Sequence, residues 1–110
     1  MRRVPVIGDG AHPEVLRVQE ELRERGFECY PWEPTTPPLP PAIIAFLTSA
    51  EPPLYFWSAF AHRSMRILPA QFSGGTLPAI MADIASANFG RDWQRALDAL
   101  VRALEQHFPA

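Results

Sequence analysis

Three side chains that can act as an acid, as a base or as ribose-binding groups gather in the segment Gly8-Asp9-Gly10-Ala11-His12-Pro13-Glu14. Asp9, His12 and Glu14 follow a β-branched run and precede a helical pattern, which is where open parallel sheets bind ligands. A structural role suits the same residues, because Asp9 or His12 can cap the helix while the glycines form the turn. The sequence leaves both roles open and favours the structural one.

Two more candidate ligand-binding residues, Ser49 and Glu51, follow the apolar run Ala42–Leu47. A serine nucleophile needs a histidine base that an acid orients, and no histidine stands near Ser49 in the sequence. The sequence therefore does not predict a Ser-His-Asp enzyme.

Composition excludes several other kinds of chemistry. All 10 basic residues of the 110 are arginine, so the chain has no Schiff-base or P-loop lysine. Its single cysteine, Cys29, cannot form an internal disulfide, and His12, His62 and His107 lack metal-ligand spacing. We expect no metal and no cofactor.

Charge and hydropathy limit the partners. With a net charge of −2 and 47% hydrophobic residues, the chain is expected to form one domain over residues 1–110 without the basic face that nucleic acids require. No apolar run is long enough to span a membrane, and the first residues lack the apolar stretch of a secretory signal. We expect no nucleic acid, no membrane and a cytoplasmic location.

The first half of the chain alternates strand and helix signals. A strand is expected at Arg3–Ile7 and a helix from Pro13, which suits a first helical turn, to a stop at Gly26. Phe27–Trp32 is expected to be the second strand. The buried face of the helix is carried by Val15, Val18 and Leu22.

The middle of the chain contains the strongest buried-strand signal, Ala42–Leu47, whose six apolar residues do not alternate with polar ones. Leu54–Arg66 is expected to be a helix and Ile67–Phe72 a fourth strand, in which Pro69 indicates an edge, a bulge or a strand end. The expected buried stripe of that helix is Leu54, Trp57, Ala61 and Met65.

The last third predicts one helical turn at Leu77–Ala82, a fifth strand at Ile84–Phe89 and an amphipathic helix over 91–108. Such alternation predicts an α/β domain with a parallel sheet of four to five strands and helices on both faces. The helix between strands two and three is missing, because residues 33–41 are too few and too rich in proline to form it.

Prolines and aromatic residues define a candidate interaction surface. Residues 33–41 form an extended connector or, alternatively, a ligand for an SH3-like groove. The rings between residues 55 and 60 cannot all face one sheet, so they are exposed at an interface or cover the sheet face without a helix, and both interpretations stay open. The interface candidates are Trp32, Pro37, Pro38, Tyr55, Phe56, Trp57 and Phe60.

Several short motifs occur in one order along the chain. They are Val15–Phe27, a helix ending in Gly-aromatic; Ile43–Ser49, an apolar strand ending in serine; Arg66–Phe72, with Ile and Pro; Leu77-Pro78 with Asp83 and Asn88-Phe89; and Asp92-Trp93. Together they resemble the Toll/interleukin-1 receptor (TIR) domain in a compact prokaryotic form, over most of the chain.

The resemblance implies a flavodoxin-like sheet of order 2-1-3-4-5. Many TIR domains cleave NAD with a glutamate four residues after a tryptophan on the third helix. Here the matching tryptophan is Trp57, the residue four positions on is Ala61, and Leu54–Arg66 contains no acid. Because a carboxylate stabilises the oxocarbenium-like state of such cleavage, this departure implies a loss of the activity.

The sequence and the resemblance together predict a TIR-like protein–protein assembly module without catalysis, in a prokaryotic signalling or defence system. Its partner is expected to be itself or another TIR-like domain, and it can belong to a larger multidomain protein. The alternative is a divergent NAD hydrolase or nucleotide-processing enzyme, with NAD bound by Asp9, His12, Glu14 or Glu51.

Overall fold

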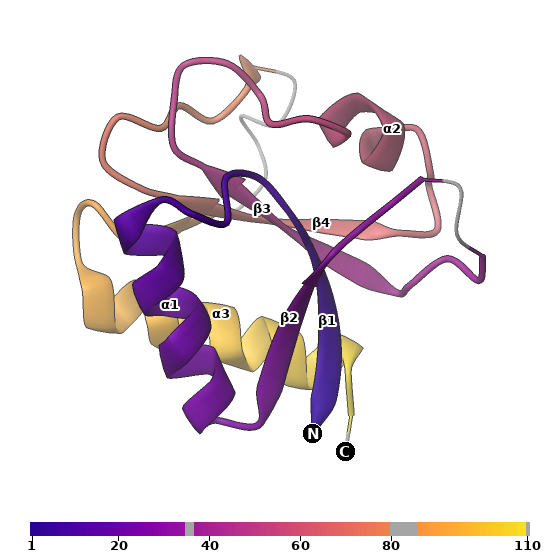
Figure 1. Cartoon of the computed structure of the whole chain (residues 1–110), viewed down its shortest axis with the longest axis horizontal. Coiled ribbons are helices and arrows are strands. Elements are labelled where there is room, and N and C mark those ends of the chain that lie inside the picture. The colour runs from indigo at the N-terminus through magenta and orange to yellow at the C-terminus, as the bar shows by residue number, and fades with distance from the viewer. Residues whose placement is uncertain (35–36, 80–85, 110) are drawn as a thin grey trace.

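The computed structural model describes residues 1–34, 37–79 and 86–109. Its sheet has five parallel strands in the order β2-β1-β3-β4-β5, which confirms the predicted flavodoxin-like α/β fold (Figure 1). The elements are β1 (Arg2–Ile7), α1 (Pro13–Glu24), β2 (Phe27–Pro31), β3 (Ala42–Leu47), α2 (Phe56–Phe60), β4 (Arg66–Gln71), β5 (Ala87–Asn88) and α3 (Trp93–His107).

The sheet separates two hydrophobic clusters. Helices α1 and α3 cover one face and α2 covers the other (Figure 1). Alternate residues of β3 enter the two clusters, Ile44 and Phe46 on the side of α1 and α3, and Ile43, Ala45 and Leu47 on the side of α2. Every residue of β3 is therefore buried, as its unbroken apolar run predicts.

The two long helices follow their sequence signals. His12 caps α1, which buries Val15, Val18 and Leu22, and Gly26 beyond its end has a φ of 89°. Asp92 caps α3 through a hydrogen bond that its side chain accepts from the Arg95 N–H at 3.2 Å. None of the helices in the described ranges has the length and apolar composition that crossing a membrane would take.

The predicted helix over Leu54–Arg66 is wrong in length and in its buried face. The observed α2 spans only Phe56–Phe60 and buries Phe56 and Ala59. Tyr55, at its N-cap, has a φ of 69°, and His62 N–H bonds back to Ala59 O in a tighter turn after the helix. Of the expected stripe only Met65 is buried, while Leu54, Trp57 and Ala61 are exposed.

The far edge of the sheet explains how Pro69 fits within β4. β5 pairs only with Ala70 and Gln71, so in the described residues β4 has no neighbour on that side at Pro69, as an edge proline requires. Residues 32–34 and 37–41, between β2 and β3, contain no helix. The expected turn at Leu77–Ala82 and the start of the expected strand at Ile84–Phe89 lie partly outside the described residues.

Candidate functional site

The carboxyl ends of β1 and β3 bring three of the predicted site residues to one place. Asp9, Ser49 and Glu51 line an open hollow of about 500 Å³. Gly8 makes this approach close, because a Cβ on Gly8 would lie 2.7 Å from the carbonyl oxygen of Phe46. Topology, rather than sequence spacing, therefore places these side chains together.

Local hydrogen bonds already occupy two of these side chains. Asp9 Oδ1 accepts from the Ala11 N–H at 3.0 Å. Ser49 Oγ accepts from the Glu51 N–H at 3.3 Å and donates to the Glu51 carbonyl at 3.2 Å. Because the Ser49 hydroxyl donates to a backbone carbonyl, nothing in this arrangement activates it as a nucleophile.

His12 and Glu14 do not line this hollow. His12 Nδ1 accepts the Glu14 N–H at 3.2 Å, as the N-cap of α1, and the His12 ring lies 6.4 Å from that of Phe72. Of the two roles considered for His12, helix cap and ligand-binding group, this is the helix cap.

The charge of the hollow is one-sided. Asp9 and Glu51 contribute two carboxylates, and no arginine or histidine is among the described residues that line it. A pyrophosphate entering here would meet like charge without a compensating cation. Among the described residues, no group of three His, Cys, Asp or Glu side chains is placed to hold a metal ion.

Trp32 and Phe56 are not part of an exposed surface, and the prediction that they form an interaction surface is wrong. Trp32 is 4% exposed and Phe56 is 1% exposed, because both pack into the cluster that covers the α2 side of the sheet. The indole Nε1 of Trp32 has no hydrogen-bond partner among the described residues. These two rings therefore fill the space left by the missing helix.

Three of the other predicted surface residues are exposed next to Leu54, which was not among them. Leu54, Tyr55, Trp57 and Phe60 are 76%, 40%, 55% and 36% exposed, and we call these four the α2 patch. The Trp57 ring lies edge-on to Phe60 at 6.0 Å. Pro37 and Pro38 are also exposed. The sequence placed Leu54 on the buried stripe of a helix, whereas it precedes α2 and is exposed.

Opposite charges flank the α2 patch. Leu54 lines the acidic hollow with Asp9 and Glu51. Phe60 lines a second open hollow of about 640 Å³ at the other end of α2, with Arg63 and Arg66. His62 and His107 also line it. The patch thus has an acidic end and a basic end.

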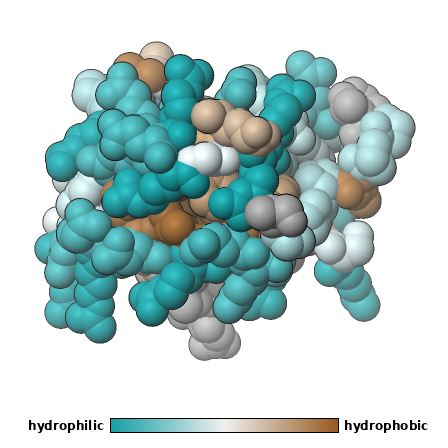
Figure 2. Space-filling model, turned by 90° about the horizontal axis from the view of Figure 1, so that it is seen from below, coloured by the Kyte–Doolittle hydropathy of each residue, from teal (hydrophilic) through white to brown (hydrophobic). Residues whose placement is uncertain are grey.

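The opposite side of the molecule is different. Figure 2, which views the molecule from below Figure 1, shows a face that is mostly hydrophilic, with hydrophobic residues in several separate areas. Four of the seven large apolar side chains that are exposed among the described residues belong to the α2 patch.

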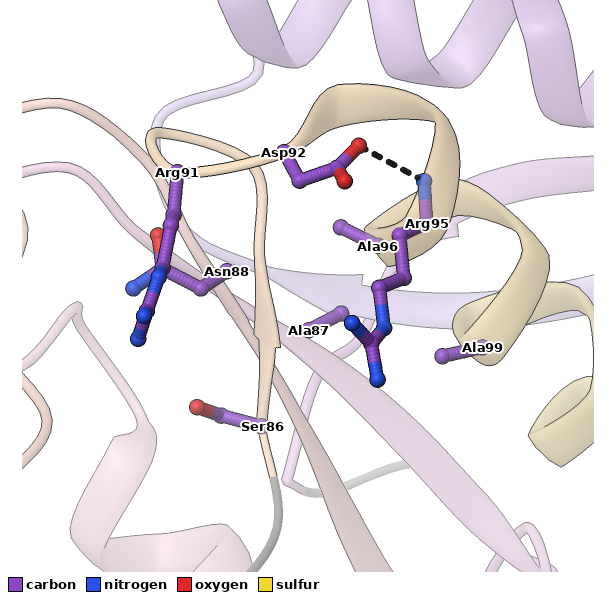
Figure 3. A pocket seen from close by; sticks show the side chains of 8 residues that line it. All are labelled: Ser86, Ala87, Asn88, Arg91, Asp92, Arg95, Ala96 and Ala99. Carbon is purple, nitrogen blue, oxygen red and sulfur yellow. Dashed lines mark hydrogen bonds between the residues drawn. The ribbon is translucent and has the colours of Figure 1, made fainter.

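A third hollow, of about 510 Å³, lies between β5 and the start of α3 (Figure 3). Arg91 and Arg95 line it together with Asp92.

Cys29 is not a candidate nucleophile. Burial raises the pKa of its thiol to about 12, so the thiol stays protonated at neutral pH and the thiolate, which is the reactive form, is scarce.

Comparisons with protein-family models, with curated proteins and with solved structures find no match for this chain. The TIR resemblance stays a prediction.

Proposed function

We propose that this chain is a TIR-like assembly module of a prokaryotic signalling or defence system, acting in the cytoplasm through self-association. The observation that carries the proposal is the α2 patch, where four large apolar side chains are exposed within seven residues. Aromatic side chains in such positions supply most of the energy of protein–protein interfaces.

A second copy of this chain is the partner that the charges favour. A two-fold axis through the middle of the α2 patch would place the acidic end, with Asp9 and Glu51, against the basic end, with Arg63 and Arg66, of the other copy. A two-fold contact uses the same surface on both copies, and this surface is complementary to itself. Another TIR-like domain with the same arrangement could replace the second copy.

Replacing Trp57 by serine is expected to weaken self-association about tenfold or more, because Trp57 is the largest side chain of the patch. Sedimentation velocity over a range of concentrations measures the effect. Trp57→Phe is the control, which keeps an aromatic ring and should keep most of the affinity. Equal dimer affinity in Trp57→Ser and the unchanged protein would show that the patch is not the interface.

NAD hydrolysis is the second candidate, and the observation that favours it is the shared hollow of Asp9, Ser49 and Glu51. The absence of a cation among the lining residues opposes it, since the pyrophosphate would not be neutralised.

We expect no nicotinamide release when the protein is incubated with NAD. Turnover that Glu51→Gln abolishes, and that Glu14→Gln outside the hollow leaves unchanged, would instead establish the enzyme. Liquid chromatography of the nicotinamide product gives the readout.

A further inference from the structure

The outer edge of the sheet at β2 presents unpaired backbone groups. Trp32 N–H donates to Val6 O, and Gly26 O accepts from Arg2 N–H, both at 2.9 Å. Since the N–H and C=O of one strand residue point to the same side and alternate along the strand, the even-numbered residues of this segment face β1. The odd-numbered ones, Phe27, Cys29 and Pro31, direct their backbone groups outward.

No strand covers these outward groups in the described part of the chain, where β2 is the terminal strand of the sheet. An uncovered edge of this kind is a template for pairing with another strand. Pro31 has no N–H to offer, so its carbonyl is its only outward group. Phe27 and Cys29 keep both the donor and the acceptor.

Helix α1 supplies side chains beside this edge. Leu16, Gln19, Glu20 and Arg23 line a shallow hollow of about 200 Å³ together with Cys29. Leu16 is 50% exposed. Glu20 and Arg23 form no ion pair among the described residues, where the ion pair of α1 joins Arg17 and Glu21.

We propose that the β2 edges of two copies pair as antiparallel strands about a two-fold axis at Cys29. In this register the two Cys29 residues exchange both backbone hydrogen bonds, and each Phe27 N–H donates to the Pro31 carbonyl of the other copy. The missing N–H of Pro31 falls at the end of the ladder, where it costs least. A shift of this register by one residue would require the backbone groups of the even-numbered residues, which face β1, to face the other copy. That register is therefore excluded.

Side chains on both faces agree with this register. Glu28 lies opposite Tyr30 of the other copy, so the two Glu28 carboxylates do not face each other across the strands. On the other face the axis makes the two α1 helices antiparallel, which brings Arg23 of one copy toward Leu16 and Glu20 of the other. The charge pattern of α1 is thus complementary to itself.

This contact goes beyond the proposed function because it uses a surface distinct from the α2 patch. Two different two-fold interfaces on one chain close into a dihedral assembly where their axes intersect, and otherwise alternate along an open row of copies. A dimer through one interface alone is the limiting case when the other is removed.

The test uses the Trp57→Ser background, which removes the patch contact. There we expect a concentration-dependent dimer by sedimentation velocity, abolished by Cys29→Pro and retained by Cys29→Val. Proline at position 29 removes an N–H that β1 does not use, which an edge strand tolerates. Thermal melting of both variants checks that they remain folded.

Charge reversal provides a second arm that does not touch the strand. Glu20→Arg and Arg23→Glu should each weaken the dimer about tenfold, since the axis repeats each change twice, and the double variant should restore it. A strictly monomeric Trp57→Ser chain would overturn the edge contact and leave the patch intact. Unchanged affinity in Cys29→Pro, or no restoration by the double reversal, would overturn it as well. An assembly of the same size and affinity in Trp57→Ser as in the unchanged protein, reduced only by Cys29→Pro, would instead reject the patch.

Discussion

Replacing Phe72 by alanine is expected to lower the free energy of unfolding by about 3–5 kcal/mol. Phe72 follows β4 and is 2% exposed. Its ring stacks on Phe89 at 5.0 Å and lies 6.0 Å from Phe46 and 6.2 Å from Trp93. Removing it would leave a cavity where β3, β4 and the start of α3 meet, and the loss is a large part of the stability that domains of this size have.

Chemical denaturation followed by circular dichroism measures this loss. Phe60→Ala is the matched control, because the same atoms are removed from a ring that is 36% exposed, and we expect a loss below about 1 kcal/mol. Both variants should be compared at low concentration, where association does not contribute. Similar losses for the two would contradict the burial of Phe72.

Gly75→Ala is expected to destabilise the fold by about 3 kcal/mol or more, although it adds only a methyl group. A Cβ on Gly75 would overlap the carbonyl oxygen of Leu47 and lie 2.6 Å from its carbonyl carbon. The backbone cannot move away freely, because Gly75 N–H donates to Phe72 O at 2.9 Å and Gln71 Nε2 donates to Gly75 O at 3.0 Å.

Gly10→Ala provides the comparison for this prediction, because a Cβ at Gly10 would meet no atom within 4 Å. The same denaturation experiment should show a change within about 0.5 kcal/mol for Gly10→Ala. If both variants were equally stable, the loop after β4 could not be packed against the end of β3 as described.

Local signals were sufficient for much of the fold. Pro13 and Gly26 bracket α1 because each acts on its own backbone, and the apolar run Ala42–Leu47 marks the central strand because both of its faces are covered. The five-residue α2 was not predictable in this way. Its length depends on how Phe56 and Ala59 pack into the hydrophobic cluster on the α2 side of the sheet. Such packing involves residues far apart in the sequence.

The candidate site was likewise predictable from the sequence only in part. In a parallel sheet the loops that follow the strands all lie at the carboxyl ends of those strands. Asp9 after β1 and Ser49 after β3 were therefore expected to lie near each other. The role of His12 as a cap, and the burial of Trp32, depend on contacts with Glu14 and with the α2 side of the sheet. The cap was one of the two roles that the sequence allowed for His12, whereas the burial of Trp32 has no local pattern in the sequence.

The unequal covering of the two sheet faces also determines where amide hydrogens exchange with water. On one face of the sheet, α1 and α3 cover a continuous cluster of 16 buried residues. The other face is covered by the five-residue α2, which buries Phe56 and Ala59. The least costly local opening is therefore the lifting of α2, which wets the neighbouring backbone while the opposite layer stays closed. A contact that clamps Trp57 from outside would slow deuterium uptake at Phe56–Phe60 first.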